Sequence, residues 1–195
     1  MFAAAALLVV VVAFRVVFGI THAHDASWLH NFSPLSALAL CGAIYFPRRV
    51  AFAFPLAALL ISDLIINAHY GVPFFTLEIL PHYAAFALVA GLGWMLRGNP
   101  RVPLVLGASM LGSALFFFVT NTASWLAEPD YGKTLAGWTQ ALTTGLPNAH
   151  PTTLEFFRNT LASDVLFTAL FVACMAMQRH AEAPAPRRHE PAPWC

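Results

Sequence analysis

The chain has 195 residues, of which 59% are hydrophobic and only 10% are charged, and its mean hydropathy is +0.68. Soluble domains average about 45–50% apolar and 25% charged residues, so this composition excludes an ordinary soluble domain and indicates an integral membrane protein. The formal net charge of +1 and the lack of a basic run flanked by aromatic residues give no indication of a nucleic-acid partner. A membrane span needs about 20 apolar residues, which leaves room for five or six spans and no separate soluble domain.

Six apolar segments predict an all-α membrane protein, a bundle of six transmembrane helices within residues 1–178. The predicted spans are Phe2–Ile20, a short segment between Pro34 and Pro47, Val50–Asn67, Ile79–Leu96, Val102–Leu126 and Leu154–Gln178. The second span gives only roughly 20 Å of helix, so we expect the loop before it to dip into the bundle. Residues 131–142 predict a short surface helix. The tail at 179–195, rich in Pro, Ala and His, is expected to be disordered and cytoplasmic.

Positive charges predict the orientation of these spans. With six spans, one side of the membrane receives seven arginines, namely Arg48, Arg49, Arg97, Arg101, Arg179, Arg187 and Arg188. Because cytoplasmic loops carry an excess of Lys and Arg, both termini are expected in the cytoplasm. Most of the histidines and acidic residues fall on the opposite side, which predicts an outward-facing pocket.

The last two spans carry polar side chains at helical spacing inside apolar sequence. They are Ser109, Ser113, Thr120, Asn121 and Ser124 in one segment, and Thr160, Asp164 and Thr168 in the other. A carboxylate roughly 15 Å along a membrane helix should face protein or water instead of lipid. The two segments are therefore expected to face each other or a shared cavity.

The acidic residues within the spans have two interpretations. Asp63 and Asp164 could bind a cationic cargo or serve a proton relay. Alternatively, they could pair with Arg15, Arg158 or neighbouring Asn and Ser groups and hold the bundle together.

Several polar residues on the predicted outer side are candidates for ligand binding. His22, His24 and His30, together with Asp25, could ligate a transition metal, although histidines that are solvated or in contact with cargo fit the same pattern. His82 lies next to Tyr83 at the outer start of a span, where it could meet a ligand or bond a helix-end carbonyl.

A further group of candidates lies near the end of the fifth span. Asn121, Thr122 and Ser124 beside Trp125 combine polar groups with an aromatic wall, as small-molecule sites do. Trp125 could equally be a membrane-interface anchor.

Five stretches carry a resemblance to a known family. In order, NFSPLSALALCGAIYF, FPLAALLISDLII, FFFVTNTASWL, YGKTLAGWTQAL and FFRNTLASDVLFTALF resemble a family of uncharacterised small bacterial membrane proteins regarded as transport proteins. The chain departs from that family at Cys41 and Ser163, where members tend to have glycine.

That family in turn resembles the S components of energy-coupling factor (ECF) transporters, six-helix subunits that capture vitamins or metal ions. The resemblance implies a cargo site near the outer face of a bacterial inner membrane. It also implies that small residues at Ala3–Ala6 dock a membrane coupling protein and its ATPases.

We therefore expect a substrate-capture subunit of an uptake transporter for a small micronutrient, vitamin or metal-bearing cofactor, with no cofactor of its own. No GxSxG, HExxH or phosphate-binding glycine loop is present, so catalysis is not expected. The expected metal ligands are His22, His24 and His30, and the expected substrate-binding residues are Asn31, Asp63, His82, Tyr83, Asn121, Ser124, Trp125, Asn159 and Asp164. Two alternatives are a structural or assembly protein without cargo, and an intramembrane hydrolase that uses Ser124 or Ser163 with a histidine.

Overall fold

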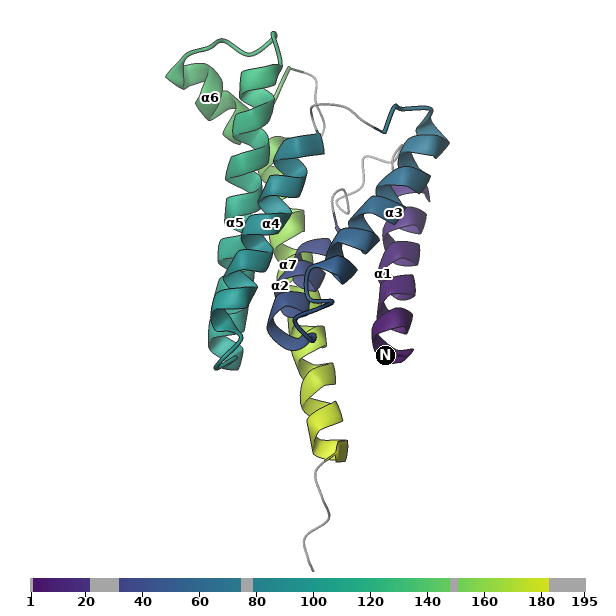
Figure 1. Ribbon diagram of the computed structural model, residues 1–195. Coiled ribbons are helices and arrows are strands. Elements are labelled where there is room, and N and C mark those ends of the chain that lie inside the picture. The colour runs from purple at the N-terminus through teal and green to yellow at the C-terminus, as the bar shows by residue number, and fades with distance from the viewer. Residues whose placement is uncertain (1, 22–31, 75–78, 148–150, 183–195) are drawn as a thin grey trace, which may run out of the picture.

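The computed structural model describes residues 2–21, 32–74, 79–147 and 151–182, with side chains in all of these ranges except 2–8 and 179–182. The described residues form seven helices and no strand (Figure 1): α1 Phe2–Thr21, α2 Leu35–Tyr45, α3 Ala53–Tyr70, α4 Ile79–Leu96, α5 Val102–Ala127, α6 Leu135–Leu142 and α7 Thr153–Glu182. Four of them, α3, α4, α5 and α7, are long and apolar enough to cross a membrane. The fold thus indicates a multi-pass membrane protein.

The helices follow the predicted segments closely. The bounds of α4 coincide with the prediction, and α6 is the short helix expected within 131–142. Helix α2 has 11 residues, or about 16 Å, against a hydrocarbon core of about 30 Å. Helix α1 has 20 residues, of which the side chains of Val9–Thr21 are described. Within the described part of the chain, four of the six expected spans are long apolar helices.

The predictions for the two ends of the chain can be compared with the structure only in part. Helix α7 continues past residue 178 as far as Glu182, so it enters the segment expected to be disordered. The rest of that tail, and the side chains of the expected docking face at Ala3–Ala6, lie outside the described part.

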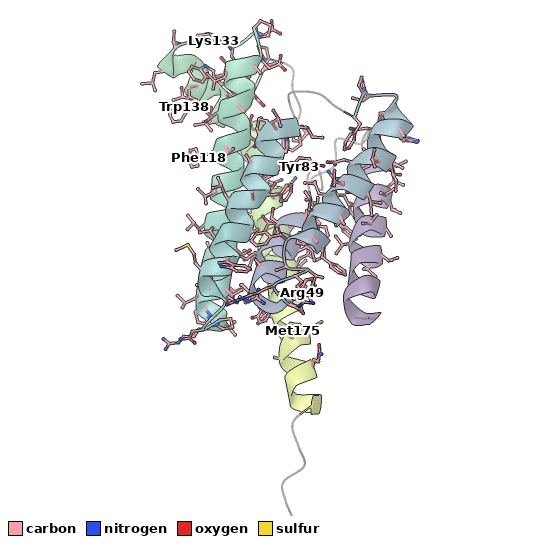
Figure 2. All side chains as sticks on the ribbon, in the orientation of Figure 1. Arg49, Tyr83, Phe118, Lys133, Trp138 and Met175 are labelled. Carbon is pink, nitrogen blue, oxygen red and sulfur yellow. The ribbon has the colours of Figure 1, made fainter. Side chains whose placement is uncertain are left out.

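The helices form two flanks with α2 between them (Figure 1). Helices α1 and α3 lie side by side on one flank, while α4, α5 and α7 pack together on the other. Helix α2 contacts α3, α4, α5 and α7. Helix α1 begins and α7 ends at one end of the molecule, the end where Arg49 lies, and Lys133 and Trp138 lie at the opposite end near α6 (Figure 2).

A close contact with α4 places α2 in the core. Leu40 and Cys41 of α2 are fully buried and pack in one cluster with Val89 of α4 and Val105 of α5. A Cβ atom on Gly93 of α4 would lie only 2.3 Å from the backbone oxygen of Leu40. Glycine is thus required for this approach, as is common where membrane helices pack closely.

The carboxyl end of α2 is also tied to α4. The guanidinium group of Arg97 donates one hydrogen bond to the backbone oxygen of Ala43 at 2.9 Å and another to that of Phe46. These carbonyls belong to the last turn, where a helix leaves its oxygens without internal partners. The cation also complements the negative end of the helix dipole. Arg97 lies over the Trp94 ring, 5.1 Å from its centroid.

Exchanging glycine for alanine at two positions of α4 tests this packing. Gly93→Ala should destabilise the protein by about 3 kcal/mol or more, because the added carbon meets backbone that cannot move aside easily. A Cβ atom added at Gly91 would have nothing within 4 Å, so Gly91→Ala should be neutral or stabilising by up to about 1 kcal/mol through helix propensity. Thermal unfolding of both variants in one detergent measures the difference. Equal effects of the two substitutions would contradict the α2–α4 contact.

Candidate functional site

A polar cavity of about 440 Å³ lies between the two flanks. Helices α1, α2, α3, α4, α5 and α7 all contribute to its wall. The described residues that line it are Arg15, Ser33, Leu35, Ser36, Leu59, Asp63, Asn67, Val72, Pro73, Ile79, His82, Phe86, Phe116, Thr120, Asn121, Ser124, Phe156, Thr160 and Asp164. Except at α2, most of these residues belong to the helix halves nearer α6, so the cavity lies toward that end of the molecule.

The short length of α2 explains where the cavity lies. Helix α2 begins at Leu35, and Ser33, Leu35 and Ser36 at its amino end line the inner part of the cavity. The neighbouring helices continue toward the α6 end, but α2 does not. The cavity therefore borders the first turn of α2.

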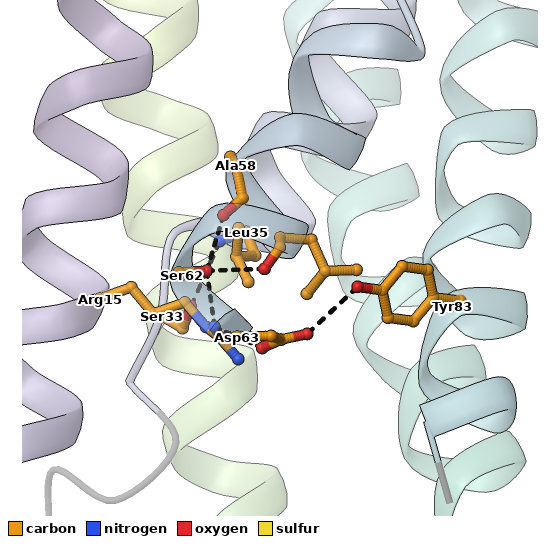
Figure 3. Close-up of polar contacts among 8 residues, drawn as sticks. Arg15, Ser33, Leu35, Ala58, Ser62, Asp63 and Tyr83 are labelled. Atoms are coloured by element: carbon orange, nitrogen blue, oxygen red, sulfur yellow. Dashed lines mark hydrogen bonds and ion pairs between the residues drawn. The ribbon is translucent and has the colours of Figure 1, made fainter. Parts of the chain in front are cut away.

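One wall of the cavity is held by an ion pair between α1 and α3 (Figure 3). The guanidinium of Arg15 lies 2.6 Å from Oδ1 of Asp63 and donates a hydrogen bond of 2.6 Å to Oγ of Ser62. The Ser62 hydroxyl in turn donates to the backbone oxygen of Ala58 at 2.6 Å. Across the cavity wall, the Tyr83 hydroxyl of α4 donates to Oδ2 of Asp63 at 3.4 Å. Asp63 therefore links α1, α3 and α4.

A polar seam joins α5 to α7. The Ser113 hydroxyl donates to Oδ2 of Asp164 at 2.7 Å, and the Thr168 hydroxyl donates to Oγ of Ser109 at 3.0 Å. All four side chains are buried. These contacts confirm that the polar positions of the last two predicted spans face each other.

Asp164 is the buried carboxylate of this seam. Its residue is 1% exposed, and its Oδ1 atom has no hydrogen-bond partner. Ser36 and the backbone N–H of Ala37, at the amino end of α2, lie next to the same carboxylate, but neither meets hydrogen-bond geometry at Oδ1. Asp164 also lines the cavity, so this buried carboxylate lies in the wall at the inner end of the space.

The predicted substrate-binding residues divide into three groups. Those that line the cavity are Asp63, His82, Asn121, Ser124 and Asp164. Tyr83, Asn159 and Trp125 are not among the lining residues. The Tyr83 hydroxyl donates a hydrogen bond to Asp63 of the cavity wall. The indole of Trp125 donates to the backbone oxygen of Gly132 at 2.9 Å. Asn31 and the three predicted metal ligands His22, His24 and His30 lie outside the described residues.

Other lining residues were not predicted as part of a site. The sequence suggested Arg15 only as a partner for an acidic residue, yet it lines the cavity as well as pairing with Asp63. The phenylalanines Phe86, Phe116 and Phe156 also line it. The sequence positions of these phenylalanines give no indication of a cavity. For Arg15 a signal was present, because a lone arginine inside an apolar span indicates a position that faces protein.

A metal site and a serine nucleophile were also considered in the sequence, and the described part of the chain can be compared with both. It contains no group of three or more His, Cys, Asp and Glu side chains close enough to hold a metal ion. The Ser163 hydroxyl, a candidate nucleophile, is fully buried and donates to the backbone oxygen of Thr160 at 2.9 Å. Neither Ser163 nor Ser124 has a hydrogen bond to a histidine within the described ranges.

Neutralising one partner of the Arg15–Asp63 ion pair should lower the stability of the protein, and neutralising both partners should restore part of it. Removing one partner of a buried pair costs roughly 3–5 kcal/mol because the other charge is left uncompensated. The Arg15 and Asp63 side chains remain 24% and 14% exposed, so we expect about half of that for Arg15→Gln. The double variant Arg15→Gln, Asp63→Asn should recover at least part of the loss, as measured by unfolding in detergent. A loss in the double variant equal to the sum of the losses in Arg15→Gln and Asp63→Asn would show that the pair is not coupled.

Comparison with known proteins places the chain in a family. Neither curated proteins nor solved structures gave a match. The model of a family of unknown function, DUF6580, matches residues 1–186. This range includes all the described helices and every residue that lines the cavity. The prediction of an uncharacterised family is thereby confirmed, and the chain belongs to DUF6580, a family of unknown function.

Proposed function

We propose that this protein is a membrane-embedded capture subunit for a small solute, resembling an ECF S component, in a bacterial inner membrane. The observation that carries the proposal is the cavity of about 440 Å³ that six helices line with both polar and apolar side chains. Small-molecule sites are concave spaces of about 300–1,000 Å³ with apolar walls and a few polar groups. A bundle that served only as a scaffold would have no need of such a space.

The distribution of charge supports an outward-facing cavity. Arg48, Arg49, Arg97 and Arg101 belong to the turns opposite α6, and the cavity lies toward the α6 end. By the positive-inside rule, the arginine end faces the cytoplasm. With α1 and α2 counted as the first two spans of a six-helix arrangement, both termini are cytoplasmic and the cavity receives solute from outside.

A partner that hydrolyses ATP would supply the energy for release of the solute. The sequence of this chain has no phosphate-binding glycine loop. We therefore propose that a membrane coupling protein and its ATPases act on the chain and that the exposed face of α1 is the docking surface. Val9, Val10 and Val17 of α1 are all more than half exposed, which is compatible with either lipid or a protein partner.

The internal hydrogen bonds also support one alternative, a structural protein without cargo. Asp63 is paired with Arg15, and Asp164 accepts a hydrogen bond from Ser113, so both carboxylates contribute to holding helices together. A structural role explains these pairs but not the cavity beside them. Binding of a guest separates the two functions.

Native mass spectrometry of the detergent-solubilised protein tests for a retained guest. Asn121 lines the cavity, whereas Phe118 on the same helix is 48% exposed and points away from the bundle (Figure 2). Asn121→Trp should fill part of the cavity and weaken the affinity for the guest at least about tenfold, a difference of about 1.4 kcal/mol. Phe118→Trp, the matched control, should retain the guest. A wild-type protein that carries no guest and binds none from a small-molecule extract would instead support the structural role.

A further inference from the structure

The outer part of the cavity wall offers hydrogen-bond acceptors. The Thr120 hydroxyl donates to the backbone oxygen of Phe116 at 2.8 Å, and the Asn121 side-chain nitrogen donates to that of Phe117 at 2.8 Å. The hydroxyl proton of Thr120 is thus used within α5, which leaves its oxygen as an acceptor. Asn121 keeps its amide oxygen and one N–H for a guest. The balance of this wall favours a guest that donates hydrogen bonds.

Among the described residues that line the cavity, the formal charges of Arg15, Asp63 and Asp164 sum to a negative value. Arg15 and Asp63 neutralise each other at 2.6 Å. Asp164 has a neutral hydroxyl, that of Ser113, as its hydrogen-bond donor, and its Oδ1 atom is unpartnered. With histidine counted as neutral, one carboxylate remains without a cation among the described lining residues. A charge buried in the protein interior acts over several ångströms, so the Asp164 carboxylate attracts a cation in the cavity without needing direct contact.

Aromatic rings complete the environment of a cation. Phe86, Phe116 and Phe156 line the cavity. The ring centroids of Phe86 and Phe116 are 5.1 Å apart with a tilt of 54°, so the two rings do not stack face to face. Aromatic faces attract ammonium groups and also cover the apolar part of a ligand.

We infer that the guest of this cavity is a small organic cation that carries N–H donors, of the class of protonated amines and amidines. This inference rests on the proposed capture function and specifies its substrate class. The charged group lies toward Asp164 and the acceptors of α5, and the apolar part of the guest packs against the phenylalanines. Among the described lining residues, an anion finds no free Lys or Arg side chain, since the guanidinium of Arg15 is already engaged by Asp63 and Ser62.

Four probes of similar size separate charge from shape in a binding experiment on the full chain in detergent. They are benzylammonium, benzyltrimethylammonium, benzyl alcohol and benzoate, compared by calorimetry or by competition in native mass spectrometry. Benzylammonium should bind at least tenfold more tightly than benzyl alcohol. Benzyltrimethylammonium, which lacks N–H groups, should fall between them, and benzoate should bind most weakly.

Matched variants identify the groups responsible. Asp164→Asn preserves the shape of the side chain and should remove the preference for benzylammonium over benzyl alcohol. Asp130→Asn changes the net charge equally at an exposed position between α5 and α6, and should leave the preference unchanged. Asn121→Leu, which removes an acceptor, gives a second test if Asp164→Asn does not fold. It should reduce the preference for benzylammonium over benzyltrimethylammonium.

The outcomes distinguish the substrate class from the capture function. If benzyl alcohol or benzoate binds as tightly as benzylammonium and Asn121→Trp abolishes that binding, the cationic class is wrong but the cavity still captures a solute. A folded Asp164→Asn variant that keeps the full preference also overturns the inference. If the wild-type protein binds none of the probes and carries no guest after purification, both proposals are wrong.

Discussion

Helix α2 is about half as long as a bilayer core is thick, yet it lies at the centre of the bundle. The exposed backbone groups at both of its ends must therefore find partners inside the protein, because lipid offers none. Arg97 supplies donors at the carboxyl end. At the amino end, Ser33 accepts a hydrogen bond from the Leu35 backbone N–H at 3.4 Å, and Asp164 lies next to the first turn. The cavity occupies the space beyond that turn.

The two acidic residues of the cavity have different surroundings. Asp63 has a cation, a tyrosine hydroxyl and some exposure, so its charge is compensated within the protein. Asp164 is almost fully buried, accepts a hydrogen bond from the neutral hydroxyl of Ser113, and lies next to Ser36 and the backbone N–H of Ala37. A buried carboxylate with an unsatisfied oxygen lowers stability, and groups of this kind in membrane helices are commonly functional. The structure therefore combines a charge-compensated pair that fixes the wall with a separate buried carboxylate that has no cation beside it among the described residues.

The sequence was sufficient for the helices and for part of the site. Because Pro34 and Pro47 flank α2, its short length was predictable. The polar residues Ser109 and Ser113 in one span, and Asp164 and Thr168 in the other, indicated the α5–α7 seam. Periodicity could not show which flank Arg15 belongs to, because that depends on how α1 packs against α3. It also could not separate a pocket tryptophan from a loop contact at Trp125, since the partner Gly132 lies beyond the helix end.

The arrangement of α1 has a mechanical implication. It packs mainly against α3, and the ion pair between Arg15 and Asp63 lies inside that two-helix unit. If α1 and α3 tilted together as one unit, the ion pair between Arg15 and Asp63 would be preserved. Among the side-chain hydrogen bonds of Asp63, the one that such a rotation would break is the long contact from Tyr83. The hinge would lie at the opposite end, where the chain passes from α2 into α3.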